Sequence, residues 1–258
     1  MKLIDKWRIM TNERAVRFEG EVRHRYELAG KLAVNKQVLD IGCGLGWGAE
    51  YLAKKKAKQV LGIDRSGAAI NYAKTNLRLE NLRFMQLDVK NIRKLKTKFD
   101  LVLIFDVLEH LPVNNVDCFI KDINLKLKPK GIVMISTPNK LVTRFSNPYH
   151  TQEFTPDGLV KLLGKYFTNL KLSGVSCVNR KLKAVRQKHE LINWLGQSKL
   201  VQELLPLVPK QIKRKVTGED KLPGVKKSEY VLSTKQVEKS DSLILIARMK
   251  SLKAGRKT

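Results

Sequence analysis

Acidic and histidine side chains directly follow an apolar run in the middle of the sequence. The run is LVLIF at residues 101–105, and Asp106, Glu109 and His110 come after it. If this segment forms a helical turn, positions i, i+3 and i+4 place all three side chains on one face. They then form a group that can hold a metal ion or move a proton.

A second group of the same chemical types follows the apolar run 131–137. It is His150 with Glu153, in the pattern HTQEF. Oxygen and nitrogen ligands of this kind suit Mg²⁺, Mn²⁺ or Zn²⁺, and a histidine can also act as a metal-free general base. We expect the catalytic residues to be His150, His110 and Glu109, and the metal ligands to be Asp106, Glu109, His110 and His150.

A glycine-rich segment, VLDIGCGLGWG at residues 38–48, has the pattern of a buried strand that enters a tight turn. Glycines are needed where the backbone turns sharply or touches a ligand. The next apolar run ends in Asp64, 20 residues after Gly44, where a carboxylate can accept from both hydroxyls of a ribose. Asp88 ends the third run and can accept from an adenine amino group. The pattern predicts a site for an adenosine-containing cofactor.

Asp40 discriminates between two such cofactors. It stands at the end of the first strand, just before the glycines. A carboxylate there opposes the pyrophosphate of NAD, which needs free backbone amides. It suits the ammonium and sulfonium groups of S-adenosylmethionine.

The elements that position these residues alternate along the chain. Short apolar runs are separated by segments of helical pattern, which predicts βαβ units and a doubly wound α/β fold with a buried parallel sheet. The expected strands are residues 37–41, 59–63, 82–87, 100–105, 131–137, 170–178 and 242–249. The expected helices cover residues 13–34, 47–56, 66–78, 115–127 and 155–166, with Ser66 and Thr155 as N-caps and Pro156 at the first helical position.

The ordered set VLDIGCGLGWG, GID, LDV and FDVLEHL closely resembles the class I S-adenosylmethionine-dependent methyltransferase family, over about residues 13–178 and the last strand. The resemblance implies a seven-stranded, Rossmann-like sheet whose last strand is antiparallel. It also implies that glycines of the turn line the methionine portion, that Asp64 holds the ribose with Arg65 beside it, and that Asp88 faces the adenine. The expected cofactor-binding residues are Asp40, Gly42, Cys43, Gly44, Gly46, Asp64, Arg65, Asp88, Val89, Phe105, Asp106 and Tyr26.

Three branches of the family share further features with the chain. The later groups resemble small-RNA terminal 2′-O-methyltransferases, which use a Glu/Glu/His/His metal site, although Asp106 stands in place of the first glutamate. They also resemble ubiquinone-type O-methyltransferases. The wider pattern, including residues 24–26, resembles enzymes that methylate hydroxyls of glycans and small phenols. We therefore expect O-methylation of a small-molecule or glycan hydroxyl, with RNA 2′-O-methylation as the alternative. From other classes, an NAD-dependent oxidoreductase and a non-catalytic binding protein stay open.

The chain is expected to be one methyltransferase domain spanning residues 1–258. Residues 1–35 would form a helical lid over the cofactor, with Tyr26 near its methionine end. Residues 36–178 and 241–250 would form the core, interrupted by a basic insertion at 179–240 and followed by a tail at 251–258.

The net charge of the chain is +27, from 51 Lys+Arg and 24 Asp+Glu. This excess predicts an anionic partner, either RNA or an acidic membrane surface, bound through residues 180–227, unless it reflects compositional bias. Three separated cysteines, an N-terminus without a secretory apolar stretch and the lack of a long apolar run predict a cytoplasmic protein without a transmembrane segment.

Overall fold

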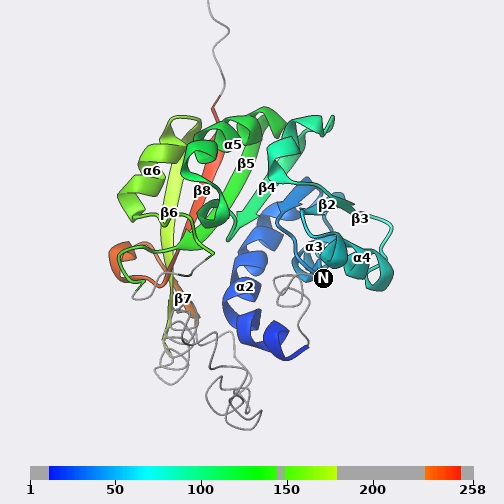
Figure 1. The fold of residues 1–258 in the computed structure, drawn as a ribbon, viewed down its shortest axis with the longest axis horizontal. Coiled ribbons are helices and arrows are strands. Elements are labelled where there is room, and N and C mark those ends of the chain that lie inside the picture. Colours follow the sequence, from blue (N-terminus) through cyan, green and yellow to red (C-terminus); the bar gives the residue numbers. More distant parts are fainter. Residues whose placement is uncertain (1–11, 144–146, 148, 179–229, 251–258) are drawn as a thin grey trace, which may run out of the picture.

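The computed structural model describes residues 12–143, 147, 149–178 and 230–250 of the chain (Figure 1). The strands are β1 Gln37–Ile41, β2 Gln59–Asp64, β3 Leu82–Gln86, β4 Phe99–Phe105, β5 Leu127–Pro138, β6 Phe167–Cys177, β7 Tyr230–Ser233 and β8 Ser242–Met249. The helices are α2 Asn12–Ala33, α3 Trp47–Lys54, α4 Gly67–Asn76, α5 Val113–Lys126 and α6 Pro156–Gly164. Short 3₁₀ turns cover Val89–Lys94, Leu108–His110 and Val237–Lys239.

All strands belong to one sheet with the order β3-β2-β1-β4-β5-β8-β6-β7. Neighbours from β3 to β5 pair in parallel, and β8 pairs antiparallel with both β5 and β6. The predicted α/β class and the antiparallel last strand are therefore confirmed. The predicted count of seven strands is wrong, because Tyr230–Ser233 pairs with the outer edge of β6 as an eighth strand. That segment lies in the predicted insertion, and its four residues are only half-buried or exposed.

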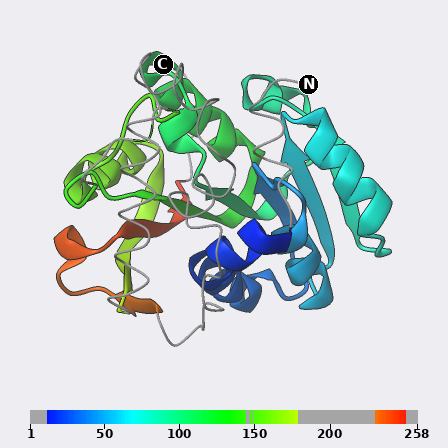
Figure 2. The same ribbon diagram turned by 60° about the horizontal axis from the view of Figure 1, so that its bottom comes forward.

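Helices cover both faces of the twisted sheet (Figure 2). Side chains of one strand alternate between the two faces, and each face has its own core. Leu101 and Leu103 of β4 pack with α2, α3 and α4, whereas Val102 and Ile104 pack with α5 and α6. Burial on both faces explains why the central strands are almost wholly apolar.

The predicted starts of α4 and α6 hold, because side-chain caps define them, whereas both helices end two residues earlier than predicted. Ser66 accepts from the backbone N–H of Ala69, and Thr155 accepts from that of Gly158, so each satisfies one free donor of a first turn. One continuous helix, Asn12–Ala33, covers the predicted segment 13–34 except for its last residue. In the described parts of the chain, the helices are all too short or too polar to cross a membrane.

The parallel strands end at a common edge, where every predicted site residue of the core lies. Residues 179–229 of the predicted insertion and the tail at 251–258 lie outside the described residues, as does the start of the lid. The described part of that lid, α2, packs beside α3 on one face of the sheet (Figure 1), and its Arg25 and Tyr26 reach Asp106 after β4 and Asp40 of β1.

Candidate active site

The glycine loop between β1 and α3 is held in conformations that only glycine adopts easily. Gly46, which caps α3, has φ +86°, and a Cβ there would lie 2.6 Å from the ring of Phe84. At Gly44 (φ +55°), by contrast, a Cβ would meet no atom within 4 Å. The loop thus packs tightly on its inner side and leaves open space on the other, as a ligand cradle requires.

Asp64 links the end of β2 to this loop. Its Oδ2 accepts from the Gly44 N–H at 3.1 Å, and its Oδ1 accepts from the Ser66 N–H at 2.8 Å. These bonds fix the carboxylate at the mouth of the loop, and a carboxylate oxygen can accept more than one hydrogen bond. Arg65 beside it is exposed.

Asp88 and Val89 begin the 3₁₀ turn that follows β3. Asp88 is half-buried and its Oδ1 accepts from the backbone N–H of Lys90, while Val89 packs against the core. The structure therefore places the carboxylates of Asp64 and Asp88 at the ends of the neighbouring strands β2 and β3, as the sequence predicted for one elongated ligand.

Asp40 lies behind the glycine loop and is fully buried. Tyr26 of α2 donates its hydroxyl to the Asp40 carboxylate, at 3.0 and 2.9 Å from the two oxygens. Burial raises the pKa of Asp40 to about 7; the Tyr26 hydrogen bond lowers it and the Asp64 charge raises it. Tyr26 also packs its ring against Phe105 and directly over Gly48, where a Cβ would come within 1.9 Å of the ring. Asp40 therefore holds the lid helix rather than facing the open space.

A second buried link joins α2 to the end of β4. Arg25, which is 4% exposed, donates through Nη1 to Asp106 Oδ2 at 2.5 Å and to Ser136 Oγ at 2.9 Å. Ser136 in turn donates to Asp106 Oδ1 at 3.2 Å. Asp106 has φ +52°, a strained backbone for a non-glycine residue, and such strain is found at sites that the surrounding structure holds in place.

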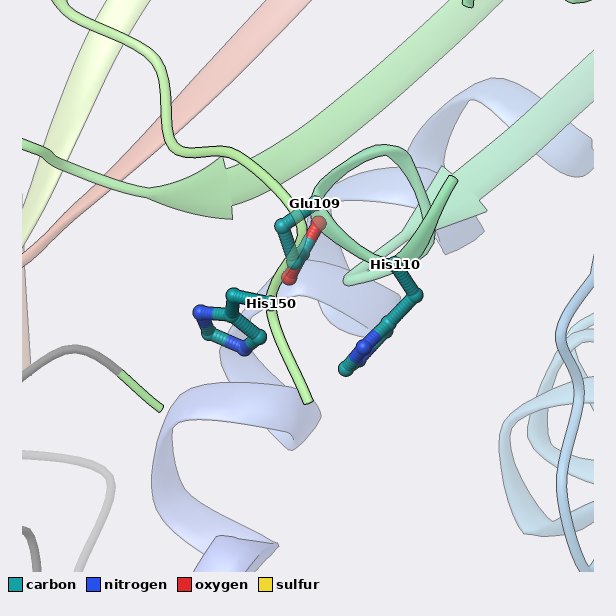
Figure 3. Close-up of side chains that lie close together, drawn as sticks. All are labelled: Glu109, His110 and His150. Carbon is teal, nitrogen blue, oxygen red and sulfur yellow. The ribbon is translucent and has the colours of Figure 1, made fainter. Parts of the chain in front are cut away.

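Glu109, His110 and His150 come together from two loops (Figure 3). One ligand atom from each residue lies within 4.8 Å of the others, and the two imidazole centroids are 4.9 Å apart. The loop that carries His150 is tied to the turn after β4, because the N–H groups of Thr151 and Gln152 both donate to the Glu109 carbonyl. The Thr151 hydroxyl adds bonds to the carbonyls of Glu109 and Leu111.

Both histidines are oriented through Nδ1. His110 Nδ1 lies 2.9 Å from the Tyr149 carbonyl oxygen, and His150 Nδ1 lies 3.0 Å from Glu153 Oε1. Because both partners are acceptors, Nδ1 is the donor in each ring, which in the neutral form leaves the lone pair on Nε2. Bonding of this kind, from the outer ring nitrogen to a carboxylate or carbonyl, is the usual support of a metal-ligating histidine.

Glu109 is fully buried, and one of its carboxylate oxygens is satisfied by Thr137 at 3.2 Å. The other oxygen, Oε1, has no hydrogen-bond partner among the residues that the structure describes. Burial first, and then the charge of Asp106, raise the pKa of Glu109 well above its usual range. A divalent cation would supply both the missing partner and the missing positive charge, so these residues fit a metal.

Comparisons with known proteins agree with this geometry. A family profile described as a methyltransferase domain matches residues 13–202. The chain belongs to the class I S-adenosylmethionine-dependent methyltransferase family. It is 31% identical over 150 residues to a probable S-adenosylmethionine-dependent methyltransferase of Mycobacterium tuberculosis, covering 55% of this chain and 52% of that protein. It is 37% identical over 112 residues to the ubiquinone biosynthesis O-methyltransferase of Pelagibacter ubique, covering 43% of this chain and 45% of that protein.

Each curated relative is thus matched over about half of its length. Among solved structures, the N-methyltransferase NodS from Bradyrhizobium japonicum, in complex with S-adenosyl-L-homocysteine, superposes with a TM-score of 0.54 at 17% identity. The match covers 88% of this chain and 86% of that chain, and at this identity it shows the shared fold.

The structure separates the four residues that the sequence predicted as metal ligands into two groups. Glu109, His110 and His150 form one group, whereas Asp106 pairs with Arg25 outside it. Sequence reasoning overlooked that Arg25 would pair with Asp106 and that Tyr26 would bond to Asp40. The pattern HRY at residues 24–26 carries these roles, but nothing in its spacing reveals partners that lie 81 and 14 residues away.

Proposed function

We propose that this methyltransferase-family protein transfers a methyl group from S-adenosylmethionine to a hydroxyl oxygen of a small molecule or glycan. The observation that carries the proposal is the placement of two groups at one edge of the sheet. The cofactor loop and Asp64 end β1 and β2, while Glu109, His110 and His150 stand on the loops after β4 and β5. Donor and acceptor would therefore meet in front of the central strands.

The cofactor would lie along the carboxyl ends of β1, β2 and β3. The glycine loop faces the methionine portion, Asp64 accepts from the ribose hydroxyls, and the segment that begins at Asp88 borders the adenine. Tyr26 and Arg25 hold α2 as one wall of this space, through the buried Asp40 and the partly exposed Asp106. The sulfonium group of the bound cofactor supplies an already activated methyl group, so much of the catalysis consists of aligning the acceptor and excluding water.

The acceptor hydroxyl must lose its proton as its oxygen bonds to the methyl carbon. The Nε2 lone pair of His150 can take that proton, and Glu153 then stabilises the charged ring through Nδ1. A divalent ion, if held by Glu109, His110 and His150, would lower the pKa of the hydroxyl instead. The buried, unpartnered Glu109 oxygen supports this second arrangement.

The rim of the site favours an acceptor with an apolar part. Val113, Leu141 and Tyr149 are 61%, 57% and 56% exposed, and all three lie on segments next to the catalytic group. Exposed apolar side chains that surround a few polar groups are typical of small-molecule sites. A phenol or a glycan linked to an apolar carrier fits this rim better than a bare polar sugar.

Cofactor choice is tested by calorimetry. We expect S-adenosylmethionine and S-adenosylhomocysteine to bind the protein and NAD not to bind. Transfer of a labelled methyl group is then measured against phenolic, glycan and RNA 3′-terminal acceptors. Binding of NAD alone would contradict the proposal. Turnover only on RNA would contradict a small-molecule or glycan acceptor and support RNA 2′-O-methylation instead.

The metal is tested separately. Chelator treatment followed by addition of Mg²⁺, Mn²⁺ or Zn²⁺ is expected to abolish and then restore turnover. Cofactor affinity, measured by calorimetry on the same samples, should stay unchanged because the cofactor is held by other residues. Full turnover in excess chelator would exclude the metal and leave His150 as the base.

A further inference from the structure

The edge of the sheet opposite the active site carries a row of lysines. Four neighbouring parallel strands begin there, in the order β2-β1-β4-β5, and antiparallel β8 ends there. Each of these five strands has an exposed lysine at this end. In sheet order they are Lys58, Lys36, Lys98, Lys130 and Lys250.

Backbone and pairing geometry keep these lysines at the edge. The Lys58 N–H donates to the Lys36 carbonyl at 2.9 Å, which joins the starts of β2 and β1. Lys98 directly precedes β4, and Lys130 lies in the irregular stretch of β5 between the pairs Phe99–Leu127 and Leu101–Ile132. Since adjacent strands lie about 4.8 Å apart, the row spans roughly 19 Å.

The row is not neutralised by nearby acids. Within the described residues, none of its five lysines takes part in an ion pair. Asp100, near the row, accepts from Lys128 and the Gln37 N–H and lies close enough to Lys36 to be influenced by its charge. Exposed Lys55, Lys56 and Lys96 flank the row. The surface is thus a line of positive charge rather than a set of salt bridges.

We propose that this lysine row binds the sugar–phosphate backbone of double-stranded nucleic acid. A line of cations about 5 Å apart matches a line of phosphates better than a membrane, whose anionic groups spread in two dimensions. The row contains no arginine for bidentate base contacts, and the exposed aromatic residues Trp47 and Tyr149 lie at the opposite edge. Binding is therefore independent of base sequence and of unpaired bases.

This surface is independent of methyl transfer. A duplex bound along the starts of the strands lies on the far side of the sheet from Glu109 and the glycine loop, so it is a docking partner and not the methyl acceptor. Neutralising the row leaves cofactor binding and turnover unchanged.

The test compares two variants of equal net charge. The row variant carries Lys58→Gln, Lys36→Gln, Lys98→Gln and Lys130→Gln. The control variant carries Lys74→Gln, Lys90→Gln, Lys235→Gln and Lys239→Gln, which are exposed lysines outside the row. Residues 179–229 and 251–258 are unchanged in both, so their charge cancels in the comparison.

Affinity is measured by fluorescence anisotropy over a series of salt concentrations, with two labelled 20-base-pair duplexes of unrelated sequence. Each lost phosphate contact reduces the magnitude of the slope of log K against log salt by about 0.9, so the row variant, with four lysines replaced, should lose roughly 3.6 units of slope and the control less than 1. Equal affinity for the two duplexes is also expected. Calorimetry with S-adenosylhomocysteine checks that both variants are folded.

Three outcomes overturn the proposal. The first is a wild-type protein that ignores both duplexes at low salt. The second is an equal loss in the two variants, which assigns any binding to overall charge. The third is row-dependent binding to vesicles containing phosphatidylglycerol together with no binding to the duplexes, which makes the partner a membrane.

Discussion

The proposed cofactor side and the proposed acceptor side of the carboxyl edge are built in different ways. On the cofactor side, the ligand space is bounded by backbone and by a carboxylate that backbone amides hold, as in the Gly44–Asp64 contact. On the acceptor side, the reactive groups are side chains from two loops, and Glu109 meets His150 across 41 residues of chain. The first surface depends on local conformation, and the second depends on how one loop docks against another.

The electrostatics of the two sides differ as well. Asp40 and Asp64 sit behind or beside the glycine loop and are satisfied by hydrogen bonds from Tyr26 and from backbone N–H groups. Glu109 retains an oxygen without a partner among the described residues. A site that is complete without a ligand suits a cofactor common to a whole family, whereas an incomplete one marks where the specific chemistry is decided.

The sharpest test of this difference removes a histidine from the acceptor side. His150→Ala and His110→Ala are each expected to lower turnover by about 10²–10⁴-fold, the usual range for loss of a positioned acid or base. The dissociation constant for S-adenosylmethionine should stay within about twofold, because neither imidazole belongs to the cofactor side.

If a metal is held, the two variants should lose it together, as measured by metal analysis after dialysis. His24→Ala is unsuitable as a control, because His24 lies in the lid beside Arg25. Cys118→Ala, an exposed position on α5, is the matched control. A large loss of cofactor affinity in His150→Ala would show that cofactor binding depends on the acceptor side. That result would contradict the separation of the two sides.

The complementary change removes a carboxylate from the cofactor side. Asp64→Ala should weaken S-adenosylmethionine binding at least about tenfold, since hydrogen bonds to a charged group contribute roughly 1.5–3 kcal/mol each. Glu80→Ala, at an exposed position before β3, is the control and should change nothing. Calorimetry measures the affinity for S-adenosylmethionine, and circular dichroism checks that each variant is folded. An unchanged affinity in folded Asp64→Ala would mean that Asp64 does not bind the cofactor.

The same contrast explains how much of the site could be predicted from the sequence. The placement of the glycine loop, Asp64 and Asp88 at one edge could be predicted because each stands at or after the end of a strand, and parallel strands end at one edge. The placement of Glu109 and His110 at that edge could be predicted for the same reason, whereas the roles of all these residues stay predictions. The pairing of Arg25 with Asp106 was not, since it depends on the angle at which α2 crosses the sheet, which no local pattern in α2 encodes.

The prediction of the fold failed only where local signals were weak. The strands buried on both faces were recognised from their unbroken apolar runs, and the final strand was placed at Ser242–Met249. The four-residue strand Tyr230–Ser233 was missed because its residues are only half-buried or exposed, so neither an apolar run nor a clear alternation marks it. Its pairing with β6 is set by tertiary context.

A conservative substitution of Glu153 tests whether this residue supports His150 as a metal ligand. Glu153→Gln keeps an oxygen that can accept from His150 Nδ1 but removes the negative charge that favours this tautomer. Metal affinity, measured by calorimetry on metal-free protein, should fall by about 10–100-fold, and Glu153→Asp should recover part of it. Glu238→Gln, on the exposed 3₁₀ turn before β8, is the control. If metal affinity changed as little in Glu153→Gln as in the control, Glu153 would have no role in metal binding.

The smallest expected effect tests the buried anchor of the lid, Tyr26–Asp40. Because the pKa of Asp40 is raised from 3.8 to about 7, the folded state binds more protons than the unfolded state between these values. The free energy of unfolding therefore falls as the pH rises through this window. Tyr26→Phe removes a hydrogen bond that favours the charged carboxylate, which raises the pKa of Asp40 further and extends the fall to higher pH.

Tyr26→Phe should accordingly cost about 1 kcal/mol at pH 5, where Asp40 is protonated, and roughly 2 kcal/mol at pH 9, where it is charged. Urea denaturation at the two pH values measures this difference. The matched control is Tyr166→Phe, whose hydroxyl bonds to Asp117 on the surface. There the Tyr166 and Lys165 hydrogen bonds hold the pKa of Asp117 below its usual range, so the cost of losing the hydroxyl should be the same at pH 5 and pH 9. A pH-independent cost for Tyr26→Phe as well would mean that Asp40 stays in one protonation state, and that the cofactor side contains no titrating anchor.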